Sequence, residues 1–258
     1  MDNPGTAAML PAHGRIACAN CFPSMHAVWE RSVMSKAGWR LENNPLAWGG
    51  QNPRVMVLGF SKGDRQCAVI RDGAPLESIP FAGMRSNLTA ILRKLGLLEE
   101  NRTVDQIIAT HGPDYHFGSL VRCSIAKLDP GNGKALKAGD IIAAAATDPV
   151  GREIVSTCSE RYLKELPSRL RNVVLLSNDD AWIDYCFQIV RRLHAGARRV
   201  NDVAYRTGDV MWIHVVHPSG SSGRHIPAWL GGADGKQGRK GQLAVDAARS
   251  LSDNSDNV

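Results

Sequence analysis

Six cysteines and the histidine His217 are the most chemically reactive side chains in the sequence. Cys18 and Cys21 form a Cys-x-x-Cys pair, and Cys123 and Cys158 lie in segments with strand and helix patterns. Thiolates are soft ligands that suit an iron–sulfur cluster or a zinc ion, and unconnected core thiols are the third interpretation. A thioredoxin-type redox pair is disfavoured, because that motif needs a preceding strand and an opening helix.

His217 stands at the end of an apolar run and begins the sequence His-Pro-Ser-Gly. An imidazole in this position can donate a hydrogen bond to a ligand, and the alternative is a buried structural histidine. A loop of serine, glycine and arginine follows directly. We therefore expect a ligand to approach the protein at this point.

The rest of the composition limits the class of protein. Cys67 and Cys186 have no comparable partners and are expected to be ordinary buried thiols, and a disulfide framework is not expected in a reducing compartment. The net charge of +6 and the pI of about 9.1 fit a polyanionic partner. Cations concentrate at residues 191–206 and 235–241, where a solvated face is the alternative.

Four apolar runs predict buried parallel strands, with helical patterns between them. Alternating strands and helices give an α/β fold with a mostly parallel sheet, and ligands of such sheets bind at the carboxyl ends of the strands. The predicted strands are Arg54 to Phe60, Phe117 to Cys123, Asn172 to Asn178 and Met211 to His217, and the predicted helices lie within residues 87–100, 148–166 and 179–196.

We expect a single domain over residues 1–232 and a polar, mobile tail over residues 233–258, with one short helix near residues 243–251. Residues 129–150 are rich in small side chains and are expected to form an insertion between a strand and a helix. The sequence has no run of about eighteen apolar residues, so no membrane span is expected. The N-terminus lacks the pattern of a signal peptide, and we expect a cytoplasmic monomer.

The cysteine pattern resembles that of a known family. A Cys-x-x-Cys pair, the Arg122-Cys123 sequence at the end of the second strand, and a Glu-Ile-x-x-x-Cys helix are similar to the iron–sulfur uracil-DNA glycosylases of the family-4 type. The interval between Cys123 and Cys158 is longer than that family usually has. The resemblance implies a three-layer α/β/α fold with a central four-stranded, mostly parallel sheet. It also implies a [4Fe–4S] cluster held by Cys18, Cys21, Cys123 and Cys158.

Three further motifs extend the resemblance from about Cys18 to Gly232. "RVMVLGFSKGD" resembles the family's first motif, "IPFAGMRSNL" its Pro-Phe-x-Gly segment, and "HPSGSSGRH" its last motif. The resemblance implies that Phe81 stacks on uracil and that His217 faces the flipped base. It also implies that the loop after His217 enters the duplex, with DNA contacts from Ser219, Gly220, Ser221 and Arg224.

Two active-site positions depart from the family. The family's carboxylate corresponds to Phe60 or Ser61, and its base-reading asparagine corresponds to Ser119. Asp64 is the nearest downstream carboxylate and is our candidate to replace it, with His217 as the second catalytic residue. Asp114 and Asp179 are further candidates, and for all three aspartates a surface or capping role is the alternative. His116 and Asn178 lie near strand ends and could donate to the base. The expected substrate contacts are Gly59, Phe60, Ser61, Phe81, Ser119 and Asn178.

The resemblance implies a DNA repair enzyme that binds uracil-containing DNA and hydrolyses the N-glycosidic bond, leaving an abasic site. The changed positions keep a second interpretation open, a DNA-binding or lesion-recognising protein that has lost the chemistry. A third interpretation, an iron–sulfur protein of electron transfer or sensing, does not explain the strand-end loops. The histidine loop and Phe81 favour the enzyme.

Overall fold

The computed structural model has an α/β fold and describes residues 8–23, 27–220, 223–232 and 234–250, without the side chains of Asp64, Arg65 and Ala138. Its strands are β1 (Gly14–Arg15), β2 (Val33–Lys36), β3 (Trp39–Glu42), β4 (Leu46–Gly49), β5 (Val55–Gly59), β6 (Tyr115–Ser119), β7 (Ser124–Lys127), β8 (Asn172–Leu176), β9 (Arg198–Asn201), β10 (Ala204–Thr207) and β11 (Val210–Val215). Its helices are α1 (Asp64–Arg71), the 3-10 helix η1 (Leu76–Ser78), α2 (Arg85–Lys94), α3 (Val104–Ala109), α4 (Ala138–Thr147), α5 (Pro149–Leu163), α6 (Asp180–Leu193), α7 (His225–Gly231) and α8 (Lys236–Arg249).

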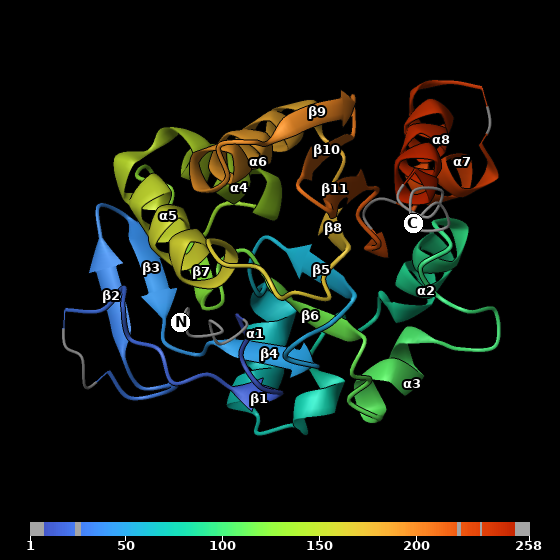
Figure 1. The fold of residues 1–258 in the computed structure, drawn as a ribbon. Helices are drawn as coiled ribbons and strands as arrows, with labels where there is room; N and C mark the ends of the chain where they lie inside the picture. Colours follow the sequence, from blue (N-terminus) through green and yellow to red (C-terminus); the bar gives the residue numbers. More distant parts are fainter. Residues whose placement is uncertain (1–7, 24–26, 221–222, 233, 251–258) are drawn as a thin grey trace, which may run out of the picture.

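An eight-stranded sheet forms the centre of the fold, in the order β1-β4-β6-β5-β8-β11-β10-β9 (Figure 1). Strands β6, β5, β8 and β11 are parallel neighbours, and two antiparallel strands extend the sheet at each edge. The four predicted strands therefore form the parallel centre. The predicted width of four strands is corrected to eight, because the edge strands are too short to give a clear apolar pattern.

Helices cover both faces of the sheet. Along β5, Val55 and Val57 belong to one apolar cluster with residues of α2, α3, α7 and α8, whereas Met56 and Leu58 belong to a second cluster with residues of α4, α5 and α6. Successive side chains of a strand point to opposite faces, so a core lies on each side of the sheet. The result is a helical layer, a sheet and a second helical layer.

A second, three-stranded antiparallel sheet, β2-β3-β7, lies beside α5. The Trp39 ring of β3 is buried against Gly151 of α5, where a Cβ atom would come within 2.6 Å of the ring. Gly151 therefore allows the small sheet and the helix to approach closely. This contact fixes the position of α5, which carries Cys158.

The C-terminal segment differs from the expected mobile tail. Helix α8 begins at Lys236, well before residue 243, and its apolar side buries Ala244 and Val245 in the cluster that also holds α7. A Cβ at Gly241 would lie 2.3 Å from the Trp229 carbonyl oxygen, so this glycine permits close packing of α7 and α8. The glycines and lysines that gave the segment its tail-like composition are thus part of a packed helix. Residues 251–258 lie outside the described residues.

The small-residue insertion at residues 129–150 also acquires structure, because it contains α4. None of the helices in the described part of the chain combines the length and apolar character needed to cross a bilayer.

Candidate functional site

The carboxyl ends of the parallel strands form the edge at which a ligand is expected. The chain passes from β5 to β6 on one side and then crosses to β8 on the other, so the direction of winding reverses between β5 and β8. At such a reversal the loops diverge and open a crevice, where α/β proteins bind ligands. Gly59, Ser119, Ser177 and His217 lie at or just beyond the four strand ends.

A pocket opens at the ends of β8 and β11, beside the first turns of α8. It contains His217 and Asn178, two of the predicted site residues. We call it the His217 pocket. It is lined by Ser177, Asn178, Asp179, Val216, His217, His225, Lys236, Gln237 and Lys240.

The ring of His217 is held in one protonation state. Its Nδ1 accepts a hydrogen bond from the Ser219 amide at 3.2 Å and lies 2.9 Å from the Ser219 hydroxyl. Burial lowers the pKa of His217, so the ring is neutral. Because Nδ1 is an acceptor, the proton of the neutral ring is on Nε2. Among the described residues Nε2 has no acceptor, so the pocket contains a fixed N–H donor.

The turn after β8 forms another wall of the pocket. Ser177 has a φ of 129°, which non-glycine residues rarely adopt. The carbonyl oxygen of Ser177 lies 2.9 Å from His214 Nδ1. Lys240 donates to the Asn178 carbonyl, and the Asn178 side-chain amide donates to Gln237 at 2.7 Å. The strained turn is therefore held by β11 and α8, as expected where a site needs fixed geometry.

Sequence analysis missed the contribution of α8 to this pocket. Gln237 and Lys240 were assigned to a mobile tail, although the cations at residues 235–241 were the visible signal. Lys240 is buried and also pairs with Asp180 at the start of α6. The glycine-rich sequence does not show where Lys240 lies, because its position depends on how α8 packs against the rest of the protein.

The predicted substrate residues of β5 and β6 do not line the His217 pocket. Gly59 and Ser119 are register partners at the ends of these strands, and the Phe60 ring packs edge-on against Trp182 with 5.6 Å between ring centroids. Ser61 follows at the start of the next loop, half-buried. These four residues belong to the β5 and β6 side of the crevice.

Phe81 is more deeply buried than a stacking role suggests. Phe81 is 6% exposed and lies in the core, 5.9 Å from Phe117 between ring centroids, with a φ of 54°. Its ring offers no open face to the His217 pocket. Asp64 begins α1, and its side chain lies outside the described residues.

The loop after His217 is tied to α2. The Asn87 side chain donates to the Pro218 carbonyl at 2.9 Å, which connects two of the motifs singled out in the sequence. Ser219 contacts His217, Gly220 follows, and Arg224 is exposed at the start of α7. Ser221 lies outside the described residues.

The other polar candidates have structural roles. Asp114 pairs with Arg169 at 2.6 Å, and Asp179 caps the N-terminus of α6. His116 is fully buried with its Nδ1 2.9 Å from the Gly50 carbonyl oxygen, and burial lowers its pKa to about 3. The contacts of the two aspartates agree with the alternatives of surface pairing and capping, and His116 is a core histidine whose buried Nε2 has no partner in the described structure.

All four predicted metal-binding cysteines line a second cavity, which we call the cysteine cavity. Cys18 and Cys21 come from the N-terminal segment, and Cys158 comes from α5. Cys123 does not end a strand as predicted, because β6 ends at Ser119 and Cys123 directly precedes β7. Cys67 and Cys186 lie outside the cavity and are buried, as expected of ordinary thiols.

The cavity disfavours free thiolates. Burial, followed by the neighbouring thiols Cys158 and Cys123, raises the pKa of Cys21 to about 12. Burial also raises the pKa of Cys123 to about 12 and raises that of Cys158. Without a bound cation, these three thiols therefore stay protonated. In the described part of the chain, no three of the cysteine sulfurs lie within 4.8 Å of one another.

Two buried cations accompany the thiols. Lys62 donates to the Arg122 carbonyl, and burial lowers its pKa to about 8. Arg122 lines the cavity and is 2% exposed, yet its three guanidinium nitrogens have no hydrogen-bond partner in the described structure. A Cβ at Gly118 would come within 1.7 Å of Nη1, so this glycine makes room for the guanidinium. A buried cation without an anionic partner is costly, which indicates that an anion is missing.

Comparison with known sequences adds no family assignment. The chain matches no protein-family model and no curated protein.

Proposed function

We propose that the protein is a uracil-DNA glycosylase-like enzyme of base excision repair. It hydrolyses the N-glycosidic bond of deoxyuridine in DNA and leaves an abasic site. The observation that carries the proposal is the neutral His217, whose Nε2–H is a fixed donor at the ligand-binding edge of the sheet. The departing uracil carries negative charge on O2, and a preorganised donor stabilises that charge.

The reaction breaks the bond between C1′ of the sugar and N1 of the base. Water supplies a hydroxyl group to C1′, and the proton of that water ends on the released uracil. The base must leave the stack to enter the pocket. Because the Asn178 amide nitrogen donates to Gln237, its Oδ1 is available to accept the N3–H of uracil. Asp64 is our candidate for orienting the water.

Contacts to DNA come from the loop after His217 and from exposed cations. Ser219, Gly220, Ser221 and Arg224 are proposed to enter or flank the duplex. Arg198 of the edge strand β9 is exposed and can contact phosphates, whereas Arg199 already pairs with Asp184. Phosphate contacts release counterions, so DNA binding should weaken as salt concentration rises.

We also propose that Cys18, Cys21, Cys123 and Cys158 hold a [4Fe–4S] cluster. Four thiols line one cavity, and Arg122 and Lys62 would balance the negative charge of the thiolates. A zinc ion held by the same four cysteines is the alternative. The bound cluster would link the N-terminal segment to β7 and α5.

A second candidate function is DNA binding without chemistry. Two observations favour it: Phe60 and Ser61 replace the carboxylate of the resembling family, and the Phe81 ring is buried in the core. A protein of this kind would bind uracil-containing DNA and release no base.

A base-release assay distinguishes the two functions. The protein is incubated with single-stranded and duplex oligonucleotides that carry one uracil, and abasic sites are then cleaved with alkali. We expect cleavage at uracil and none in a matched thymine oligonucleotide. Binding without cleavage by the wild-type protein would support the second function. If the protein neither binds nor cleaves the oligonucleotides, both functions are excluded.

A further inference from the structure

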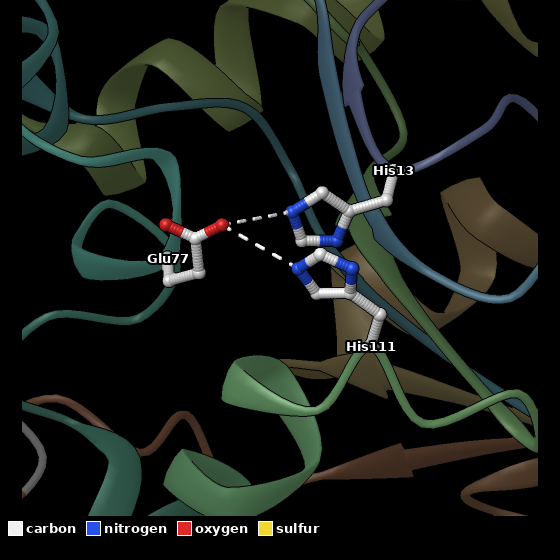
Figure 2. A group of neighbouring side chains, drawn as sticks. All are labelled: His13, Glu77 and His111. Carbon is white, nitrogen blue, oxygen red and sulfur yellow. Dashed lines mark hydrogen bonds and ion pairs between the residues drawn. The ribbon is translucent and has the colours of Figure 1, made fainter.

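A cluster of side chains outside both sites has the composition of a metal site. His13, Glu77 and His111 come from three separate segments and turn their polar atoms toward one another (Figure 2). The Nε2 atoms of His13 and His111 each lie 3.4 Å from Oε1 of Glu77. Among the described residues, no other group of three or more histidine, cysteine or acidic side chains has its ligand atoms this close.

We propose that His13, Glu77 and His111 bind one divalent transition-metal ion of the zinc type. Two imidazole nitrogens and one carboxylate oxygen are the protein ligands of many open zinc sites. Bonds of about 2.0–2.2 Å in tetrahedral geometry separate neighbouring ligand atoms by roughly 3.3–3.5 Å. The two 3.4 Å distances in the cluster match that separation.

The buried nitrogen of His13 supports the same assignment. The His13 side chain is 14% exposed, and in the described structure its buried Nε2 atom has a long contact of 3.4 Å with Glu77 Oε1 but no hydrogen bond of good geometry. A metal ion would give this nitrogen a stronger partner. Glu77 and His111 are 42% and 50% exposed, so solvent can supply a water molecule as the fourth ligand.

Binding requires two local changes. The rings of His13 and His111 stack with 3.6 Å between centroids, so the half-exposed His111 must turn its ring to aim at a shared ion. His13 Nδ1 accepts the Gly49 amide at 3.3 Å, so metal at Nε2 moves the ring proton to Nδ1 and gives up this long hydrogen bond. Protons therefore compete with the metal for the imidazole nitrogens, and binding should weaken as pH falls.

The position of His13 indicates what the ion would do. His13 precedes Cys18 by five residues, whereas Glu77 lies in η1 and His111 follows α3. An ion held by all three would link the segment that leads into β1 to η1 and to the turn after α3. This role is structural and does not depend on the proposed glycosylase activity.

The test is a titration of the full-length protein, cysteines intact, with Co²⁺ and Zn²⁺. We expect one site whose Co²⁺ spectrum lacks thiolate charge-transfer bands. Loss of a residue that only orients a metal ligand lowers metal affinity by about 10- to 100-fold, and loss of a ligand should lower it at least as much. We therefore expect His111→Ala and Glu77→Gln each to weaken metal binding by about 100-fold. Glu100→Gln, at an 87% exposed glutamate, should bind as the wild type does.

The variants also separate this site from the cysteine cavity. Cys123→Ser should leave the affinity of this site unchanged. Circular dichroism establishes that each variant is folded. If His111→Ala does not fold, Glu77→Gln still tests the site, because it preserves the shape of the side chain. Wild-type affinity in Glu77→Gln, or a Co²⁺ spectrum that changes only in the cysteine variants, would overturn the proposal.

Discussion

The His217 pocket and the cysteine cavity differ in the hydrogen-bond partners that they offer to buried polar groups. In the pocket, protein partners hold the Ser177 turn and orient Asn178 and His217, and they leave the His217 Nε2–H free to donate to a ligand. In the cavity, the described residues offer no acceptor to the Arg122 guanidinium, and burial raises the pKa of the Cys123 thiol to about 12. Contacts within the protein therefore fix the geometry of the pocket, whereas the proposed cluster would supply the charge that balances Arg122 in the cavity.

Because of this difference, substitutions in the two sites should have different effects. Changes in a preorganised pocket should alter a rate or an affinity, because the surrounding structure stays intact. Changes in a cavity that is proposed to hold a cluster should alter cluster assembly and protein stability, and the sign of the stability change should depend on whether the cluster is bound.

The largest effect is expected at the cavity. Cys123→Ser should abolish cluster assembly, because it removes one of four ligands, whereas Cys67→Ser is a matched control at another buried cysteine. Iron and sulfide content and visible absorption measure the result. Equal iron content in the wild type and Cys123→Ser would exclude the proposed ligand set, and a colourless wild type with stoichiometric zinc would favour a zinc site.

The next effect is expected in the pocket. His217→Ala should lower single-turnover uracil release by at least about 100-fold, because it removes a preorganised donor. DNA affinity and the midpoint of thermal unfolding should change little. Uracil release at the wild-type rate by this variant would contradict the assigned role of His217, and a large loss of stability would contradict the contrast between the two sites.

Arg122 gives a sharper test, because the sign of its effect should reverse. Arg122→Met should stabilise the cluster-free protein by about 1–4 kcal/mol, since it replaces an unpaired buried charge with an apolar side chain. The same substitution should make the assembled cluster less stable, because a balancing charge is lost. Urea unfolding of the cluster-free protein and the rate of iron loss to a chelator measure the two effects. Destabilisation in both states would mean that Arg122 is partnered without the cluster.

The free energy of unfolding should also depend on pH, with a modest change for each pH unit. Burial lowers the pKa of both His116 and His214 to about 3, below the ordinary value of 6.5. Below pH 6.5 the unfolded chain binds protons at these rings and the native protein does not. Each histidine should therefore lower the free energy of unfolding by about 1.4 kcal/mol per pH unit as pH falls toward 3.

Two measurements check this pH dependence. Urea unfolding at pH 7 and pH 5 gives the slope, and NMR titration should reveal two histidine rings that remain neutral at pH 5. A stability that stays constant between these pH values would show that the two rings are protonated in the native protein.

The sequence determined the parallel centre of the sheet and the grouping of the cysteines. Long apolar runs such as Asn172–Leu176 are unambiguous because both faces of the strand are buried, and period and length alone reveal them. The short edge strands, the start of α8 and the end of β6 were missed or displaced. In these segments the apolar signal is weak, and pairing with neighbours decides the structure.

The tertiary structure alone decided which side chains meet. Lys240 and Gln237 reach the His217 pocket only because α8 packs on the sheet, and Arg122 is buried beside Cys158 only because α5 lies against the small sheet. His13, Glu77 and His111 are far apart in the sequence and form no recognisable spacing. Sequence patterns report local periodicity and composition, whereas these contacts join distant segments whose approach depends on the packing of the whole chain.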